Sequence, residues 1–301
     1  MKTILIAGGS GYIGSHLYSH LEEQSSVTSI DYGISPTEKD FINLDITDIY
    51  KVNDFAKNCD CFDILIFLVG LAHAKGKGKD LPEFNKVNYQ TLVNLFSALD
   101  SNNKIPEKII FASTISVYGE QYNQSSYNEN LTLHPFSPYA VTKLQAEGYL
   151  LDNFATNSWI LRFAPVYFSD FLLNINRRTK AGCNFYRVGK GNNKLSLCNI
   201  ENIKTAIDGI IEGSIPPGIY NLSDAKEYTY NDLLTWYNAA RVIRIPKFVI
   251  NVIYLIGKMI NNTFLKENTI KLISDNVFPS DKIRSYIDLP AAINDLKFGN
   301  D

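Results

Sequence analysis

Three residues near the middle of the chain have the types and spacing needed to move a proton. Tyr139 and Lys143 lie four positions apart in a stretch predicted to be helical, so their side chains share one helix face. A cation beside a phenol favours the phenolate and lowers the phenol pKa, which makes Tyr139 a usable general base near neutral pH. Thr114 ends an apolar strand, at the sheet edge where open α/β folds bind ligands. Its hydroxyl can hold the substrate oxygen that Tyr139 deprotonates.

An isolated Tyr and Lys at this spacing more often lie on an exposed helix, where the Lys is a surface residue. Whether Tyr139 and Lys143 are catalytic therefore depends on the elements around them. The apolar run from Thr3 to Ala7 is typical of a strand buried on both faces of a parallel sheet. Gly8, Gly11 and Gly14 follow at once, and residues 15–23 are predicted to be a helix. A strand, a glycine turn and a helix N-terminus in this order form a cradle for a pyrophosphate.

A second short strand, residues 27–30, ends at an acidic residue whose distance along the chain from the glycine turn is typical of a dinucleotide site. Asp31 lies 17 positions after Gly14, near the roughly 20 expected for the carboxylate that binds the adenosine ribose. Residues 32–35 contain no Arg, so nothing in them suits a 2′-phosphate. This segment therefore predicts NAD rather than NADP.

Taken together, these features resemble the extended short-chain dehydrogenase/reductase family, whose nucleotide-sugar epimerases, reductases and dehydratases share a Ser/Thr…Tyr-x-x-x-Lys triad. The Gly-x-x-Gly-x-x-Gly spacing is the extended-family form. The catalytic hydroxyl three positions before Val117 is Thr114, with Ser113 the weaker candidate. The resemblance covers nearly the whole chain and weakens after about Arg241.

The family's fold is α/β: a doubly wound parallel sheet (Rossmann-type) with a smaller C-terminal substrate lobe. By resemblance, residues 1–165 are the NAD-binding domain, with later strands near 196–225 returning to it. Residues 166–301 are mainly the substrate-binding lobe.

The resemblance also implies which residues bind NAD. They are Gly8, Gly11, Tyr12, Ile13, Gly14, Asp31, Asp45, Ile46, Leu68, Gly70, Asn88, Tyr139 and Lys143. Lys143 has two roles, lowering the Tyr139 pKa and holding the nicotinamide ribose. For Asp45, an equally weighted interpretation is a cap for the helix predicted at 49–57. Asn88 lies on a long amphipathic helix predicted over 82–99.

The substrate site departs from the family pattern at two places. Pro165 stands where the family usually has Asn, and Leu195 stands about where a family Arg grips the diphosphate. The remaining substrate candidates are Ser116, Arg177, Arg178 and Arg187, although a charged surface is the alternative for each Arg. The basic loop 75–79 is either a solvated turn or a flap over substrate phosphates.

The implied activity is NAD-dependent C4 epimerisation of a nucleotide sugar, with UDP the favoured nucleotide, through a transient 4-keto sugar. The main alternative is a 4-ketoreductase in surface-polysaccharide synthesis. A 4,6-dehydratase is disfavoured, because Ile115 and Ser116 stand where that group has Asp-Glu. A non-catalytic dinucleotide sensor is also disfavoured, because such proteins generally lose the triad.

Composition narrows the class of protein. The 301 residues are 45% hydrophobic and 20% charged, and the net charge of −2 gives no footprint for nucleic acid. The N-terminal apolar run is too short for a signal peptide, and the four Cys suggest reduced thiols, so we expect a cytoplasmic protein. His16 and His20 lie one helical turn apart, but a solvated face is favoured over a metal site, and no metal is expected.

Two further segments bear on partners. Residues 247–260 are strongly apolar but too short to span a bilayer. A packed helix is the first interpretation, and a membrane-surface helix flanked by Arg241, Arg244 and Lys247, with contact through residues 245–260, is the second. The helices predicted at 82–99 and 138–154 resemble those of the family's four-helix dimer interface, which implies a homodimer.

Overall fold

The structure is a computed structural model that describes residues 1–33, 39–71, 81–119, 124–260 and 262–296, with the side chains of 263, 264 and 267 left undescribed. The chain forms two compact units. The first comprises residues 1–114, 138–162 and 207–220, and the second comprises residues 115–137, 163–206 and 221–301. The basic loop 75–79 lies outside the described residues.

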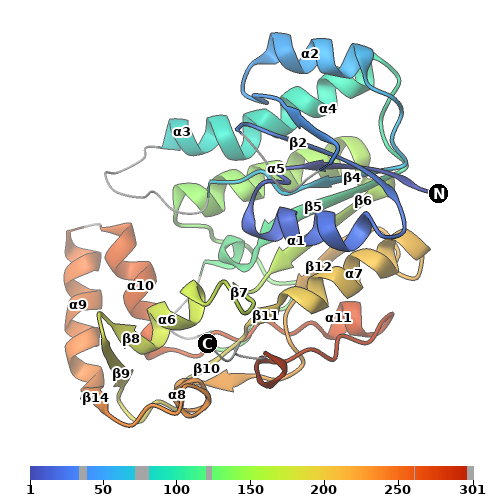
Figure 1. The fold of residues 1–301 in the computed structure, drawn as a ribbon. Helices are drawn as coiled ribbons and strands as arrows, with labels where there is room; N and C mark the ends of the chain where they lie inside the picture. Colours follow the sequence, from blue (N-terminus) through green and yellow to red (C-terminus); the bar gives the residue numbers. More distant parts are fainter. Residues whose placement is uncertain (34–38, 72–80, 120–123, 261, 297–301) are drawn as a thin grey trace. The chain divides into compact units, whose positions relative to one another are not determined.

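A seven-stranded sheet is the centre of the first unit (Figure 1). Its order is β12-β6-β5-β4-β1-β2-β3. The strands are β1 (Thr3–Ala7), β2 (Ser26–Asp31), β3 (Phe41–Asn43), β4 (Ile64–Phe67), β5 (Lys108–Thr114), β6 (Ser158–Phe163) and β12 (Gly218–Leu222). Strands β1 to β5 pair in parallel, with β1 between β2 and β4. The strand order therefore reverses at β1, which is where open α/β sheets bind their ligands.

Helices cover both faces of this sheet, which confirms the doubly wound fold (Figure 1). One face carries α2 (Ile49–Asn58), α4 (Thr91–Ser101) and α5 (Pro138–Phe154), and the other carries α1 (Tyr12–Leu21) and α7 (Ile200–Glu212). Buried side chains of β1, β4 and β5, such as Leu5, Phe67 and Phe111, pack against Leu95 of α4 and Leu150 of α5. Strands buried on both faces need continuous apolar runs, which is the pattern that the sequence has.

The helix predicted over 82–99 is not uniform. It consists of α3 (Leu81–Asn85), a π-helical turn (Lys86–Gln90) and α4. A π turn accommodates an extra residue and is common at functional sites, but it barely alters the apolar period from which a helix is predicted. Asn88 lies in this π turn.

The second unit is built from short strands and short helices. Its strands form the pairs β7 (Val166–Tyr167) with β11 (Cys198–Asn199) and β10 (Lys194–Leu195) with β13 (Tyr228–Thr229), and a sheet of β14 (Val242–Ile245), β9 (Asn184–Val188) and β8 (Lys180–Ala181). The helices α6 (Leu173–Thr179), α8 (Tyr230–Trp236), α9 (Lys247–Met259), α10 (Thr263–Ile273) and α11 (Asp281–Arg284) complete it. A buried carboxylate ties these pieces together, because Asp224 accepts hydrogen bonds from the hydroxyls of Tyr167 (2.7 Å) and Tyr228 (2.9 Å).

Helices α9 and α10 form a hairpin whose two members lie side by side (Figure 1). A Cβ at Gly257 would lie 2.9 Å from the Cβ of Leu265, so the glycine permits the close approach of the helices. Ile250 packs with Tyr186 and Val188 of β9 in a small core. Within the described ranges, the search for a helix long and apolar enough to traverse a bilayer finds none.

Candidate active site

The glycine turn between β1 and α1 is too tight for a side chain at Gly8 or at Gly14. Gly8 has φ +91°, and a Cβ there would lie 2.9 Å from the Val69 amide nitrogen. A Cβ at Gly14 would overlap the Gly8 carbonyl oxygen and lie 2.5 Å from the Gly9 carbonyl oxygen. The N-cap of α1 is Gly11, whose lack of a side chain leaves the first-turn amides accessible to an anion. The turn therefore suits a pyrophosphate.

Asp31 is held beside this turn at the carboxyl end of β2. Its carboxylate accepts hydrogen bonds from the backbone amides of Ser10 (3.2 Å) and Tyr32 (2.8 Å), and from the Ser10 hydroxyl. Tyr12, the first residue of α1, is exposed, and Ile13 is half-buried. The residues predicted to bind the pyrophosphate and the ribose thus lie next to one another, which fits a dinucleotide.

The alternative that Asp45 caps α2 is wrong. Asp48 is the N-cap, and its side chain accepts from the amides of Tyr50 (3.1 Å) and Lys51 (3.4 Å). Asp45 instead accepts from the Thr47 hydroxyl (2.7 Å) and amide, and the hydroxyl bond is the main cause that holds the pKa of Asp45 below its usual value. Asp45 lies three residues before this N-cap, in the turn that precedes the helix.

Its neighbour Ile46 is buried, and the Ile46 carbonyl accepts a hydrogen bond from Asn94 of α4 (3.2 Å). This bond anchors the turn that carries Asp45.

Asn88 joins the segment after β4 to α5. Its side chain accepts from the Leu71 amide (2.6 Å) and donates to the Thr142 hydroxyl (3.2 Å). The Leu68 amide donates to the Ala7 carbonyl (2.8 Å), which continues the pairing of β4 with β1. Gly70 lies between these groups, since a Cβ there would be 3.1 Å from Lys143 Nζ and 3.8 Å from Asn88 Oδ1.

Thr114, Tyr139 and Lys143 all belong to the first unit. The side chains of Thr114 and Tyr139 are hydrogen-bonded to each other. Lys143 Nζ donates to the carbonyls of Ala112 (2.9 Å) and Val69 (3.2 Å) and lies 4.7 Å from the centre of the Phe111 ring. The ammonium therefore bridges the carboxyl ends of β5 and β4.

The prediction that the Tyr139 pKa lies below its usual value is wrong for this structure. Burial raises the Tyr139 pKa, and the hydrogen bond with Thr114 offsets only part of that rise. Burial also lowers the pKa of Lys143 to about 7, against the opposing effect of Glu147. The contacts of Lys143 with two carbonyls were not evident from a four-residue spacing.

A buried ion pair next to Lys143 and Ser113 was not predicted as part of the site. Arg162 Nη2 lies 2.6 Å from Glu147 Oε2, and Arg162 Nε donates to Glu147 Oε1 (3.1 Å). The Ser113 hydroxyl donates to the same carboxylate. Glu147 follows Lys143 by one helical turn and influences its pKa. One available signal was Arg162 itself, a charged residue inside an otherwise apolar strand.

Comparison with known proteins identifies this arrangement. The model of the NAD dependent epimerase/dehydratase family matches residues 4–223. The chain belongs to that family. Membership confirms the predicted family and NAD as the cofactor of that family. Preference for NAD over NADP stays a prediction.

Two relatives with similar sequences illustrate the membership. An uncharacterized UDP-glucose epimerase of Bacillus subtilis is 32% identical over 182 residues, which is 54% of this chain and 56% of that protein. A putative UDP-glucose 4-epimerase of Methanocaldococcus jannaschii is 29% identical over 176 residues, again 54% and 56%. The matches thus span a little over half the length of these relatives.

Solved structures support the fold. A putative epimerase from Burkholderia cenocepacia has a TM-score of 0.74 at 17% identity, covering 98% of this chain and 94% of the other. The UDP-glucuronic acid 4-epimerase of Bacillus cereus in complex with NAD has a TM-score of 0.69 at 22% identity, covering 96% and 94%.

One of the two histidines of α1 has an acidic partner. His20 Nε2 lies 2.8 Å from an Asp208 carboxylate oxygen of α7, so the residue has an acidic partner that is distant in sequence. The favoured interpretation, a solvated helix face, did not predict this partner. Among the residues with described side chains, no cluster of three His, Cys, Asp or Glu could hold a metal ion.

The second unit carries the substrate candidates. Ser116 lies half-buried in the 3-10 turn Ile115–Tyr118 that follows β5. Arg178 donates to the Asn174 carbonyl (2.7 Å), and burial lowers the pKa of Arg177. Arg187 donates to the Asn231 side chain through Nη1 (3.0 Å). Its Nε is buried and, within the described part of the chain, has no hydrogen-bond partner.

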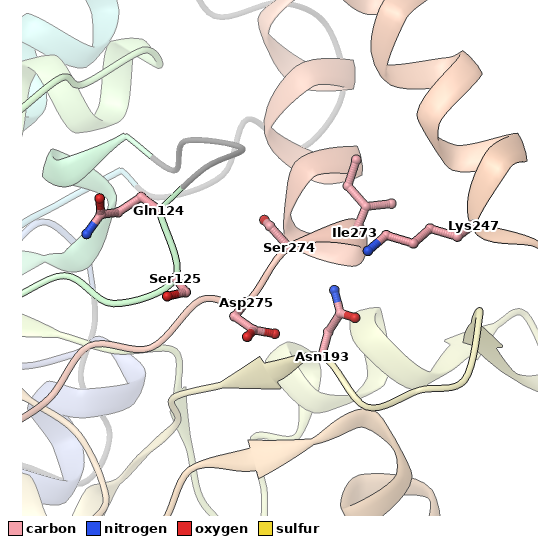
Figure 2. A pocket seen from close by; sticks show the side chains of 7 residues that line it. All are labelled: Gln124, Ser125, Asn193, Lys247, Ile273, Ser274 and Asp275. Carbon is pink, nitrogen blue, oxygen red and sulfur yellow. The ribbon is translucent and has the colours of Figure 1, made fainter.

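A polar hollow of about 260 Å³ lies in this unit and was not predicted. Figure 2 shows the side chain of Lys247 reaching toward it from the start of α9. Its lining residues are Gln124, Ser125, Asn193, Lys247, Ile273, Ser274 and Asp275. None of these is a predicted catalytic, cofactor or substrate residue.

Proposed function

We propose that this protein interconverts nucleotide sugars, with UDP-hexoses the favoured substrates, by NAD-dependent epimerisation at C4. The observation that carries the proposal is the hydrogen bond between Thr114 and Tyr139, on the same unit as the glycine turn and Asp31. The names of the two relatives, an uncharacterized UDP-glucose epimerase and a putative UDP-glucose 4-epimerase, support the choice of substrate class.

In the proposed reaction Tyr139, as phenolate, takes the proton of the sugar's C4 hydroxyl while Thr114 holds the same oxygen. Bound NAD supplies the acceptor, and then the donor, of the C4 hydride. The 4-keto sugar then rotates in the site so that its other face receives the hydride, and Tyr139 returns the proton to the oxygen. No proton or hydride is consumed overall. Lys143 contributes positive charge beside the site and holds the nicotinamide ribose. Glu147 opposes the loss of that charge on burial, because its carboxylate favours the ammonium form.

For the diphosphate, Arg187 is the proposed ligand within the second unit. Its buried Nε has a hydrogen available for an oxygen, and its Nη1 is already positioned by Asn231. Arginine suits phosphate because its planar donors match two oxygens. Arg177, Arg178 and Ser116 stay weaker candidates.

The test is the conversion of UDP-glucose and UDP-galactose, and of their acetamido and uronic counterparts, followed by NMR because epimers have equal mass. Tyr139→Phe keeps the ring but removes the proton acceptor, so turnover per bound NAD should fall by about 10²–10⁴-fold. The control Tyr50→Phe changes an exposed tyrosine of α2 and should keep full turnover. Near-full turnover by Tyr139→Phe would refute the proposed base.

A second candidate, the 4-ketoreductase, is favoured by one feature. Leu195 stands where an arginine is expected, and it is 2% exposed within a core with Tyr228 and Leu233, so it offers no polar contact. The usual contact with the substrate diphosphate is therefore changed, which leaves room for a UDP-4-keto sugar as substrate. Stoichiometric consumption of added NADH on a UDP-4-keto sugar, without epimerisation of UDP-hexoses, would identify this activity.

A further inference from the structure

Helix α9 has apolar residues on two opposite sides. Ile250, Ile253, Tyr254 and the small Gly257 repeat at helical spacing and face the hairpin partner and the β9 core. Phe248, Val252, Leu255, Ile256 and Met259 form a second stripe, displaced by about half a turn from the first. We call this second stripe the α9 ridge.

The α9 ridge is exposed along its whole length. Phe248 is 67% exposed, Leu255 is 55% exposed and Met259 is 86% exposed. Ile260, just beyond the helix, is 61% exposed. A cluster of large apolar side chains on one helix face is more than the scattered exposure normal for a protein surface, and it marks a contact surface.

The charged residues of the segment that contains the ridge have one sign. Residues 241–260 contain Arg241, Arg244, Lys247 and Lys258 and no Asp or Glu, a charge of +4 in a chain whose net charge is −2. Arg241, Arg244 and Lys258 are exposed. The surface that complements the ridge must therefore be both apolar and anionic.

We propose that the α9 ridge binds the surface of a membrane that contains anionic lipids. An interfacial helix with apolar residues on one face and basic residues at its edges buries the apolar face at the level of the head groups. The 13 residues of α9 extend about 20 Å, so the helix lies along the surface rather than across it.

A second copy of the chain suits the ridge less well than a membrane does. A two-fold contact between ridges would bring the same basic residues of both copies together, and like charges across an interface oppose binding. Lipid head groups supply negative charge beside hydrocarbon, which matches both properties of the ridge. The inference does not depend on the proposed function.

The experiment is flotation of the purified protein with vesicles of phosphatidylcholine alone or with 30 mol% phosphatidylglycerol. We expect binding to the anionic vesicles, weakened by 0.5 M NaCl because salt screens the basic residues. Phe248→Glu with Leu255→Glu should lower the partition coefficient more than tenfold. Arg244→Gln with Lys258→Gln should lower it about fivefold for each charge removed.

A matched control places two Glu residues at exposed tyrosines elsewhere, Tyr50→Glu with Tyr286→Glu, and should bind like wild type. Equal thermal unfolding midpoints show that all variants are folded. Failure of wild type to float with anionic vesicles, or equal loss in the control, overturns the proposal. Self-association that the Phe248→Glu, Leu255→Glu variant abolishes, without flotation, would instead assign the ridge to a second copy.

Discussion

At the scale of single residues, the hydroxyl of Thr114 opposes the effect of burial on Tyr139. Burial disfavours the phenolate, and the hydrogen bond favours it. Because the Tyr139 pKa stays above its usual value, deprotonation of Tyr139 should make wild-type turnover rise with pH, and loss of the Lys143 charge above its pKa of about 7 should oppose that rise. Thr114→Val keeps the shape and removes the hydroxyl, so the rise should shift to higher pH, with turnover at pH 7 lower by roughly 10²-fold.

The measurement is kcat/KM against pH for wild type, Thr114→Val and Thr114→Ser. The Ser variant keeps a hydroxyl at this position and should follow wild type more closely than the Val variant. A Thr114→Val profile that superimposes on wild type would exclude the hydrogen bond from catalysis.

Lys143 should make the stability of the free protein depend on pH. Its folded pKa of about 7 lies below the reference value of 10.5, so between these values the unfolded chain binds more protons than the folded chain. The free energy of unfolding therefore rises with pH across this window, by at most about 1.4 kcal/mol per pH unit for one proton. Lys143→Met removes this dependence, although it also loses two hydrogen bonds at every pH.

Urea unfolding at pH 6, 7.5 and 9 tests this prediction. The difference between wild type and Lys143→Met should move in favour of wild type as pH rises, whereas the exposed-lysine control Lys51→Met should track wild type. A difference that is constant from pH 6 to 9 would contradict the depressed pKa of Lys143.

At the scale of elements, the turn between β1 and α1 requires a glycine at position 14, whereas the middle of α5 does not require one at position 148. A Cβ at Gly14 meets the carbonyls of Gly8 and Gly9, whereas a Cβ at Gly148 meets nothing within 4 Å. Gly14→Ala should therefore distort the cradle and weaken NAD binding at least tenfold. Gly148→Ala should keep NAD affinity and stabilise α5 by about 0.5–1 kcal/mol, the usual gain of Ala over Gly in a helix.

Calorimetric titration with NAD and thermal unfolding of both variants give the two readouts. Wild-type NAD affinity in Gly14→Ala would show that the turn does not hold the pyrophosphate.

At the scale of the whole molecule, we predict a homodimer with two-fold symmetry, assembled through α4 and α5. Gly148 on α5 offers a selective probe, because no atom lies within 4 Å of a Cβ placed there. Gly148→Arg should leave the single chain folded yet obstruct a partner packed on α5. Light scattering at micromolar concentration should give a dimer for wild type and for the exposed-site control Tyr50→Arg, and a monomer for Gly148→Arg. A monomeric wild type would end the prediction.

Local signals in the sequence determined several of the strands, turns and helices of this protein. The apolar run of β1, the glycines after it and the 3.6-residue period of α5 predicted the sheet, the turn and the helix that carries Tyr139 and Lys143. Thr229 with Asp232 three residues later is a local cap signal of the same kind, and the Thr229 side chain accepts from the Asp232 amide (3.1 Å) at the start of α8. These features depend on backbone angles and neighbours within one or two turns, so the sequence expresses them directly.

Other features were decided only by the tertiary structure. The partners of Glu147 and His20 are Arg162 and Asp208, which lie 15 and 188 positions away. The pKa values of Tyr139 and Lys143 depend on how completely the fold removes these groups from water, and that removal reversed the prediction for Tyr139. Burial is set by all the elements that pack around a group, and no spacing within one element encodes it.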